Sequence, residues 1–582
     1  MVLFQFCQNK RGNFRMRAII KTQVDGFICR RHLPHTTGII FFQPPGSFYQ
    51  IQHAANYELV IVGEVADALY LCGMFSKVRV RFAPSPTGGL HLGGVRTVLY
   101  NYLFAKKHGG DFIVRVEDTD QTRFVEGAEA YIFNCLKWCG LEPDESVLHG
   151  GAYAPYRQSE RKATYRQYAE QLIKEGHAYY AFDTTEELEM MRGKLKASGS
   201  SSLQYDQRIR MQMNNSLRLL PEETQALLDK GTPYVIRIKV NANEVIPFTD
   251  MIRGDIEFDS NNVDDKVLLK ADGMPTYHLA VVVDDHLMKI SHAFRGEEWL
   301  PSAPVHILLW KHLFGLDAMP QWAHLPLILK PDGNGKLSKR DGDRLGFPVY
   351  AMDWQDPVTK DITKGFKEIG FLTEAFINLL AVLGWNDGTE QEVFTMEELI
   401  EKFSIERVHK GGAKFDFEKA KWYNHEWIKK LPVTSYGLRV KTIFESNAVI
   451  INDNEYFFKV MELIKDRCTL LPDFYTQGVF FFQSPTVIDT DTIKSKWDEK
   501  KNLFFTELLR AYQLITDWEH AGLENEFKEI AAANQLKPGE LMLPFRIMLV
   551  GGKFGPGVFD IAGMIGKEAT VNRIEHTLSL LQ

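Results

Sequence analysis

The stretch R-F-A-P-S-P-T-G-G-L-H-L-G-G occupies residues 81–94 and lies between two different sequence patterns. Before it, residues 78–82 alternate apolar and basic side chains, which predicts a strand that ends in the Pro/Gly-rich turn. After it, residues 93–108 are predicted to form a helix. The free N–H groups and the dipole of a helix start bind phosphate, and His91 can add a hydrogen bond there. Gly93 and the glycine that follows let a nucleotide approach the backbone.

A second string, K-L-S-K-R at residues 336–340, follows the Gly/Asp-rich loop P-D-G-N-G. Two lysines on such a loop suit the neutralisation of a triphosphate. Taken alone, a basic loop of this kind is usually a solvated surface feature. Its occurrence 245 residues after His91 makes the pair of strings far more specific than either one.

Composition limits the class of protein. The chain has 582 residues, a net charge of −7, 45% hydrophobic and 25% charged residues, which excludes a disordered chain, a collagen and a coiled coil. The six cysteines form no pair of C-x2-C motifs, so buried thiols and no structural zinc are expected. The longest apolar run, residues 59–75, is broken by Glu64 and Asp67, so no membrane span is expected.

Strands and helices are predicted to alternate after residue 78, which favours a parallel α/β sheet. A strand is expected at 111–116 and helices at 127–139 and 161–175, whereas the different pattern between about 178 and 275 indicates an insertion. The apolar run H-L-A-V-V-V at 278–283 predicts a buried parallel strand. A helix follows at 299–313, and beyond about 370 the pattern is almost wholly helical.

These motifs resemble those of the class I aminoacyl-tRNA synthetases, and within them the bacterial and organellar glutamyl type. The family's H-I-G-H motif corresponds to residues 91–94 and its K-M-S-K-S loop to residues 336–340. Gly94 replaces the second motif histidine and Arg340 the last serine, so more of the phosphate binding must depend on His91 and the lysines. Further matching stretches are R-V-E-D-T-D (115–120), P-Y-R-Q-S-E-R (155–161), P-T-Y-H-L-A (275–280), V-D-D-H-L-M (283–288) and R-G-E-E-W-L (295–300).

The resemblance implies an α/β Rossmann-type class I catalytic domain with an inserted α+β domain for the tRNA acceptor end, followed by an all-α anticodon-binding region. The expected parts are a leader (1–76), the first half of the catalytic domain (77–177), the inserted domain (178–275), the second half with the K-L-S-K-R loop (276–345), a stem-contact region (346–400) and the helical anticodon-binding domain (401–582).

The resemblance also implies a pocket for glutamate, whose carboxylates need an arginine held as a bidentate fork. Glu117 is expected to pair with the substrate ammonium, Arg81 with the side-chain carboxylate, and Arg295 to lie close to the substrate carboxylates. The expected glutamate residues are Arg81, Ser85, Glu117, Tyr277 and Arg295, with residues 277–281 forming one wall. The expected ATP residues are His91, Gly93, Glu298, Trp299, Lys336, Leu337, Ser338, Lys339 and Arg340.

Acidic clusters in these stretches leave other interpretations open. Glu117, Asp118 and Asp120 could instead hold a metal or cap a helix. Asp284 and Asp285 also invite a metal interpretation, although they more often orient neighbouring groups.

The implied reaction forms glutamyl-adenylate from glutamate and ATP and then transfers glutamate to the terminal adenosine of tRNA. His91, Lys336 and Lys339 are the expected catalytic residues, and Mg²⁺ is expected to arrive with ATP. The expected partners are L-glutamate and tRNA(Glu), with Arg467 as a candidate tRNA contact, no membrane and a monomeric state. Alternatives are an enzyme that also charges tRNA(Gln) and an inactive tRNA-binding paralogue, against which the intact His91 and lysines argue.

The first 76 residues contain seven basic residues and four acidic ones. An Arg-rich, acid-poor start is typical of a mitochondrial or chloroplast leader, and the mitochondrial matrix is the predicted location. Initiation at Met74 would remove the leader and predict a cytoplasmic enzyme.

Overall fold

The computed structural model describes residues 2–8, 14–20, 49–50, 77–200 and 202–581. Two compact units divide the chain, Met1–Lys77 and Val78–Gln582. In the first unit the described strands β1 (Val2–Gln8), β2 (Phe14–Ile20) and β3 (Tyr49–Gln50) form an antiparallel sheet. The apolar run at 59–75 and Met74 lie outside the described residues.

The second unit is built on a six-stranded sheet with the order β5-β4-β11-β12-β8-β9. Its strands pair in parallel, except for the antiparallel hairpin β8–β9 at one edge. The strands are β4 (Arg79–Phe82), β5 (Asp111–Val114), β8 (Val245–Asp250), β9 (Gly254–Asp259), β11 (His292–Gly296) and β12 (Gln321–Leu325). The predicted parallel α/β architecture is therefore confirmed.

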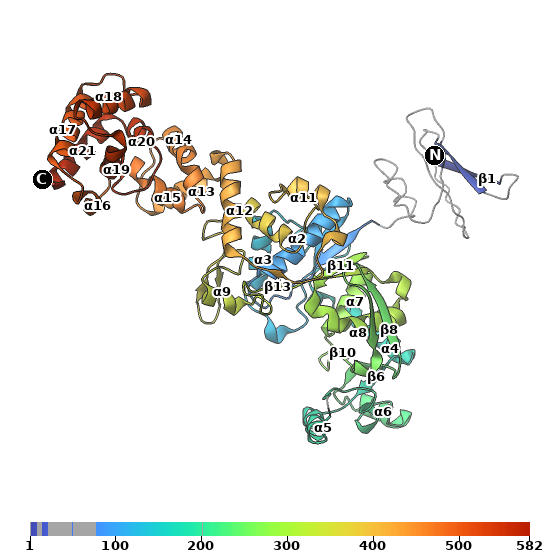
Figure 1. Cartoon of the computed structure of the whole chain (residues 1–582). Helices are drawn as coiled ribbons and strands as arrows, with labels where there is room; N and C mark the ends of the chain where they lie inside the picture. Colours follow the sequence, from blue (N-terminus) through green and yellow to red (C-terminus); the bar gives the residue numbers. More distant parts are fainter. Residues whose placement is uncertain (1, 9–13, 21–48, 51–76, 201, 582) are drawn as a thin grey trace. The chain divides into compact units, whose positions relative to one another are not determined.

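Helices cover both faces of this sheet, as a parallel sheet requires (Figure 1). Successive residues of β11 point to opposite faces: Phe294 packs into the core that contains helix α2, and Ala293 into the core that contains α7 and α8. The helices are α2 (Leu92–Lys107), α3 (Ala128–Trp138), α4 (Lys162–Lys174), α7 (Tyr277–Leu287) and α8 (Ala303–Leu313).

The prediction of a strand at 278–283 is wrong, because these residues lie inside helix α7. Every residue from Leu279 to Asp285 is buried, so the helix shows no polar face that would reveal its period in the sequence. A short, wholly apolar run fits a buried strand and a buried helix equally well.

Residues between 178 and 275 contribute to two sheets. A separate antiparallel sheet has the order β10-β7-β6, whereas β8 pairs with β12 of the central sheet. The elements are β6 (Ala178–Ala181), α5 (Thr185–Ala197), α6 (Pro221–Asp229), β7 (Val235–Ile238) and β10 (Val267–Leu269). The boundaries of the inserted domain stay a prediction.

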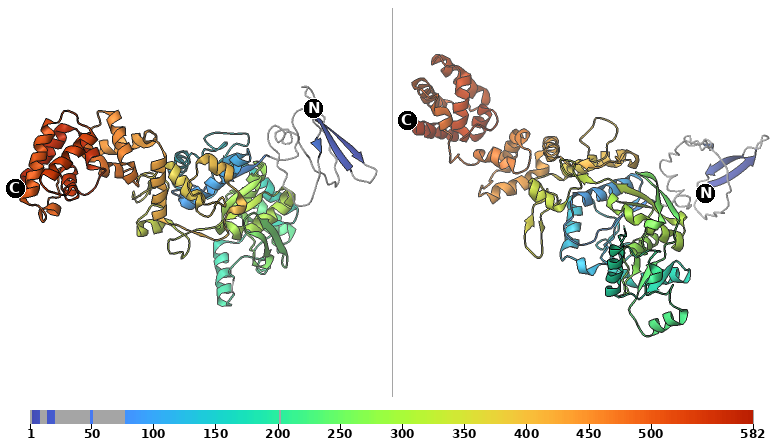
Figure 2. Two further views of the ribbon diagram at one scale, coloured as in Figure 1. Left: turned by 45° about the horizontal axis from the view of Figure 1, so that its top comes forward. Right: turned by 60° about the horizontal axis from the view of Figure 1, so that its bottom comes forward.

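Residues 373–581 form an almost wholly helical region, drawn from yellow to red in Figure 2. Its helices are α10 (Thr373–Val382), α11 (Met396–Lys402), α12 (Phe417–Lys430), α13 (Val433–Ser446), α14 (Asn454–Ile464), α15 (Asp473–Gly478), α16 (Asp491–Lys494), α17 (Glu499–Leu514), α18 (His520–Ala533), α19 (Pro538–Val550), α20 (Val558–Ile565) and α21 (Lys567–Leu581).

The short strands that complete the fold are β13 (Ile328–Leu329), β14 (Trp354–Gln355), β15 (Ile362–Thr363) and β16 (Ala413–Lys414). Within the described part of the chain, the helices are too short or too polar to cross a bilayer.

Leu380→Ala tests the core that joins α10 to the central sheet. Leu380 is fully buried in the core that also holds α2 and β4. Its truncation should lower the free energy of unfolding by about 2–5 kcal/mol, through lost burial and the cavity left behind. Urea unfolding measures the change. The exposed Leu438, at 77% accessibility, provides the matched control, and Leu438→Ala should leave the midpoint unchanged. Equal midpoints for the two variants would contradict this packing.

Candidate active site

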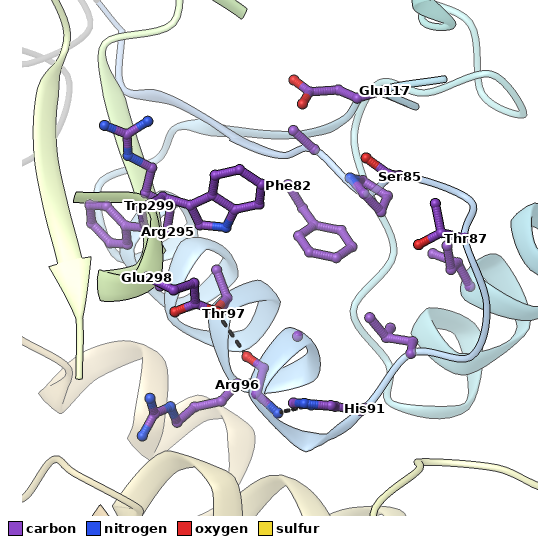
Figure 3. Close-up of a pocket in the computed structure, with 18 of the residues that line it drawn as sticks. Phe82, Ser85, Thr87, His91, Arg96, Thr97, Glu117, Arg295, Glu298 and Trp299 are labelled. Carbon is purple, nitrogen blue, oxygen red and sulfur yellow. Dashed lines mark hydrogen bonds between the residues drawn. The ribbon is translucent and has the colours of Figure 1, made fainter. Parts of the chain in front are cut away.

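A pocket of about 390 Å³ opens where β4 and β11 end and α2 and α7 begin. In Figure 3, Arg295, Glu298 and Trp299 lie on one side of it, and Ser85, Thr87 and His91 on the other. The structure brings eleven of the predicted residues to its lining: Arg81, Ser85, His91, Gly93, Glu117, Tyr277, Arg295, Glu298, Trp299, Lys336 and Leu337.

The remaining predicted residues lie elsewhere. Ser338 lines a small adjoining pocket together with His91 and caps helix α9 (Lys339–Leu345). Lys339 and Arg340 form the first turn of α9, and their side chains are outside the described part of the structure. Arg467 is an exposed residue of the 3-10 turn after α14, far along the chain from this pocket.

The phosphate-binding end of the pocket is the start of α2. His91 is the N-cap of this helix, and its Nδ1 accepts a hydrogen bond from the backbone N–H of Gly93 at 2.9 Å. A neutral imidazole therefore carries its proton on Nε2. A Cβ on Gly93 would come within 2.9 Å of His91 Cε1, so a side chain here would have to displace the His91 ring. The predicted strand–turn–helix unit is confirmed.

Lys336 reaches the same pocket from the other string. Its Nζ donates to Glu298 Oε1 at 2.7 Å, and both side chains are about two-fifths exposed. Burial alone would raise the pKa of Glu298, but the hydrogen bond from Lys336 holds it below its usual value. An incoming phosphate would therefore meet a lysine whose position is already set by a carboxylate.

At the other end of the pocket, three buried arginines are held by carboxylates. Asp285 on α7 accepts from Arg81 Nε at 3.1 Å and from Arg115 NH1 at 2.8 Å. Burial opposes ionisation of Asp285, yet the two arginines outweigh it and keep its pKa low. Its neighbour Asp284 accepts from Arg161 Nε at 2.7 Å. The two aspartates therefore orient neighbouring arginines, which agrees with the interpretation favoured over a metal site.

Glu117 completes this ionic cluster. It accepts from Arg115 NH2 at 2.9 Å and lines the pocket. Burial raises its pKa, and Arg115 offsets only part of that effect. An ammonium group in the pocket would therefore stabilise the charged form of Glu117.

Arg295, which is 7% exposed, differs from Arg81, Arg115 and Arg161 because its described hydrogen-bond partners are all uncharged. Its Nε donates to His324 at 2.9 Å, and its NH1 lies 3.3 Å from the Tyr277 hydroxyl and 3.2 Å from His306. Its NH2 has no hydrogen-bond partner among the described residues. Burial lowers its pKa, but a guanidinium stays charged at neutral pH. Arg295 is therefore a buried cation of the pocket that no ion pair satisfies among the described residues.

Comparisons with known proteins match this arrangement. The family profile described as tRNA synthetases class I (E and Q), catalytic domain, matches residues 77–422, and that described as anticodon binding domain matches residues 418–578. The glutamate–tRNA ligase of Christiangramia forsetii is 51% identical over 509 residues, which cover 88% of this chain and 100% of that protein. This chain belongs to the glutamate–tRNA ligase family of class I tRNA synthetases.

Other relatives agree. The glutamate–tRNA ligase of Cytophaga hutchinsonii is 50% identical over 506 residues, covering 87% of this chain and 98% of that protein. A crystal structure of a glutamate–tRNA ligase from Elizabethkingia meningosepticum, in complex with its amino acid, is 46% identical, with a TM-score of 0.84. It covers 87% of this chain and 100% of that one. The predicted family and fold class are confirmed.

ATP use is common to class I synthetases, and Mg²⁺ generally accompanies it. In the part of this synthetase that the structure describes, no group of three His, Cys, Asp or Glu side chains could hold a metal ion. The pocket carboxylates Glu117 and Glu298 are already paired with Arg115 and Lys336. These residues fit Mg²⁺ that enters as part of its ATP complex, held by phosphate and water.

Among the residues that sequence reasoning missed are Arg96, which lines the pocket of this synthetase, and Asp250, His306 and His324, which lie behind Arg295. His306 and His324 are single polar residues in apolar segments, and Asp250 belongs to none of the motifs described above. The sequence contains one indication of the contact between Arg295 and His324. Both H-A-F-R at 292–295 and Q-W-A-H at 321–324 have a polar residue at the fourth position of a strand. In the parallel pair β11–β12 these fourth residues, Arg295 and His324, lie directly opposite each other.

Asp284→Ala should destabilise this synthetase strongly. Asp284 is fully buried and accepts hydrogen bonds from Gln158, Arg161 and Tyr165. Its removal leaves buried positive charge without a partner, which costs about 3–5 kcal/mol. Urea unfolding measures the loss. Asp491→Ala, at a side chain 92% exposed, should leave the midpoint unchanged. A stable Asp284→Ala variant would show that the ionic cluster is not required for folding.

Proposed function

We propose that this chain ligates L-glutamate to tRNA(Glu) in two steps, with ATP as the activating substrate. The observation that carries the proposal is one pocket with a phosphate-binding helix start at one end and buried arginines at the other. His91 and Gly93 form the first end, and Arg81 and Arg295 the second. The named relatives are glutamate–tRNA ligases, which supports the same substrate for this chain.

In the first step a carboxylate oxygen of glutamate attacks the α-phosphorus of ATP. A P–O bond forms, the bond to the β-phosphate oxygen breaks, and pyrophosphate leaves. The attacking carboxylate is already ionised, so no protein base is needed, and catalysis consists of positioning and charge neutralisation. His91 and the backbone at the start of α2 would bind phosphate oxygens, assisted by Lys336 and Lys339.

In the second step a hydroxyl of the terminal adenosine of tRNA, the 2′-hydroxyl by family resemblance, attacks the carbonyl carbon of the adenylate. The bond between that carbon and the phosphate oxygen breaks, AMP leaves and takes up the hydroxyl proton, and glutamate becomes esterified. The region between β6 and β10 would bind the acceptor end and the helices beyond residue 417 the anticodon, where unpaired bases are accessible. Arg467 stays a predicted tRNA contact, and the monomeric state stays a prediction.

Glutamate would be distinguished from glutamine by charge. A neutral amide would leave an arginine of the pocket without its carboxylate, and an unpaired buried charge is costly. Arg81 is suited to the side-chain carboxylate, because Asp285 fixes its Nε and the terminal nitrogens have no partner among the described residues.

Two alternatives to strict tRNA(Glu) charging are tested together by one experiment. The purified protein, ATP and radiolabelled L-glutamate are incubated with tRNA(Glu) or tRNA(Gln), with L-glutamine as the control amino acid. We expect glutamate on tRNA(Glu) and no reaction with glutamine. Glutamate on both tRNAs would show a non-discriminating enzyme, and binding of tRNA without charging would show an inactive paralogue.

Arg81→Ala should lower kcat/KM for glutamate about a hundredfold or more, while the KM for ATP changes by less than about twofold. The reason is the loss of the guanidinium fork at the amino-acid end alone. Steady-state aminoacylation measures both constants, and Arg81→Lys provides a variant that keeps the charge beside Asp285. Arg510→Ala, at an exposed arginine of α17, is the matched control. Unchanged glutamate kinetics in Arg81→Ala would contradict the assignment.

The mitochondrial location stays a prediction that depends on the composition of residues 1–76. A fusion of residues 1–76 to a fluorescent protein tests it in cultured eukaryotic cells. Accumulation in mitochondria is expected, with the fluorescent protein alone as control. A diffuse signal would favour initiation at Met74.

A further inference from the structure

Arg295 is surrounded by a chain of mostly buried side chains, and no carboxylate of the described residues contacts it directly. Asp250 at the end of β8 lies 2.6 Å from His324 Nδ1, and His324 Nε2 accepts from Arg295 Nε at 2.9 Å. On the other side, His306 Nδ1 lies 3.2 Å from Arg295 NH1, and His306 Nε2 lies 3.1 Å from His278 Nδ1. The histidines come from β12, α8 and α7, so three elements converge on one guanidinium.

The chemistry of the partners assigns the proton positions. A guanidinium only donates, so the ring nitrogens that face Arg295 must be lone pairs. His324 therefore carries its proton on Nδ1 and donates it to Asp250, and His306 carries its proton on Nε2 and donates it to His278. Asp250 also accepts from the backbone N–H groups of Ile252 and Arg253, which holds its carboxylate in place.

Burial keeps the three rings neutral. It lowers the pKa of His278 to about 4 and the pKa of His306 well below its usual range, and the charge of Arg295 acts in the same direction on both. Burial also lowers the pKa of His324, although Asp250 works against it. Arg295 thus gains two imidazole acceptors, and the part of the chain that the structure describes places no counter-charge in contact with it.

This environment contrasts with that of Arg81, whose Nε is bound directly by Asp285. A carboxylate in the place of either histidine would compete with a substrate carboxylate for the guanidinium. A neutral imidazole fixes the plane of the guanidinium and leaves its charge available. The NH2 group of Arg295 has no hydrogen-bond partner among the described residues, and the side chain lines the pocket. This group can therefore donate a hydrogen bond to an anion in the pocket.

We propose that His306 and His324 are positioning residues that hold Arg295 as an uncompensated cation aimed at a carboxylate of the substrate. This inference rests on the proposed function and deepens it, because it names how the pocket keeps a second arginine, besides Arg81, available for the substrate's carboxylates. His278 and Asp250 act through them, by fixing which ring nitrogen carries the proton.

The two histidines face Arg295 with different ring nitrogens, which gives an unusually specific test. A glutamine side chain can place its oxygen near the Nε2 position of a histidine, and an asparagine near the Nδ1 position. H324Q should therefore keep the acceptor for Arg295 and H324N should lose it, whereas H306N should keep it and H306Q should lose it. A general packing defect would not make glutamine the better substitute at position 324 and asparagine the better substitute at position 306.

The experiment is aminoacylation of tRNA(Glu) by the full chain, with KM measured separately for glutamate and ATP. Losing a hydrogen bond to a charged group should raise the KM for glutamate about tenfold or more in H324N and H306Q relative to their partners. The KM for ATP should change by less than about twofold in all four variants. H576N and H576Q, at an exposed histidine of α21, should be identical to the unchanged protein.

Thermal unfolding identifies variants that do not fold. If both variants at one histidine fail to fold, the comparison of the two amide variants at the other histidine tests the proposal by itself. The positioning role would be overturned by equal KM values for glutamate within each pair of variants. It would also be overturned if the same amide, asparagine or glutamine, gave the lower KM at both positions. Failure of the unchanged protein to charge tRNA(Glu) with glutamate would overturn the proposed function instead. The two failures are therefore distinguishable.

Discussion

Two adjacent aspartates on α7 hold the amino-acid end of the pocket together. Asp285 binds Arg81 of β4 and also Arg115, which follows β5, and Asp284 binds Arg161 beside α4. Each guanidinium would be costly to bury alone, and the aspartates make its burial tolerable through direct ion pairs. Because the arginines come from separate segments, this cluster also fixes helix α7 against the strand ends. The position of Tyr277, in the first turn of α7, follows from the same contacts.

The phosphate end depends on a different principle. It is local in sequence, since β4, the Pro/Gly-rich turn and the start of α2 follow one another within residues 79–92. Backbone geometry, the His91 cap and Gly93 build this local part, and Lys336 joins it from a distant segment. The pocket thus combines a locally encoded phosphate site with an amino-acid site assembled from distant segments.

This difference explains what could be predicted from the sequence. The strand, turn and helix around His91 were predictable because each has its own pattern, and the resemblance extended this to Arg81, Glu117, Tyr277 and Arg295. Helix α7 was mistaken for a strand, because burial on all sides removes the polar residues that reveal a helical period. His306 and His324 carry no local signal, and their role exists only through the packing of α8 and the register of β11 with β12. The side chains of Lys339 and Arg340 are a part of the predicted site that the described structure does not test.

The short connection between β4 and α2 has a consequence for substrate length. Arg81 lies next to the end of a strand of the central sheet, and His91 caps the helix packed on that sheet. These two elements therefore set the span between the carboxylate site and the phosphate site. A fixed distance between the two sites determines how long an amino acid must be to reach both of them. Aspartate has the same charges as glutamate but is one methylene shorter. When its side-chain carboxylate reached the arginine, its α-carboxylate would stop short of the position from which it could attack phosphorus. The fold would thereby exclude the shorter acidic amino acid by distance, where charge alone makes no distinction.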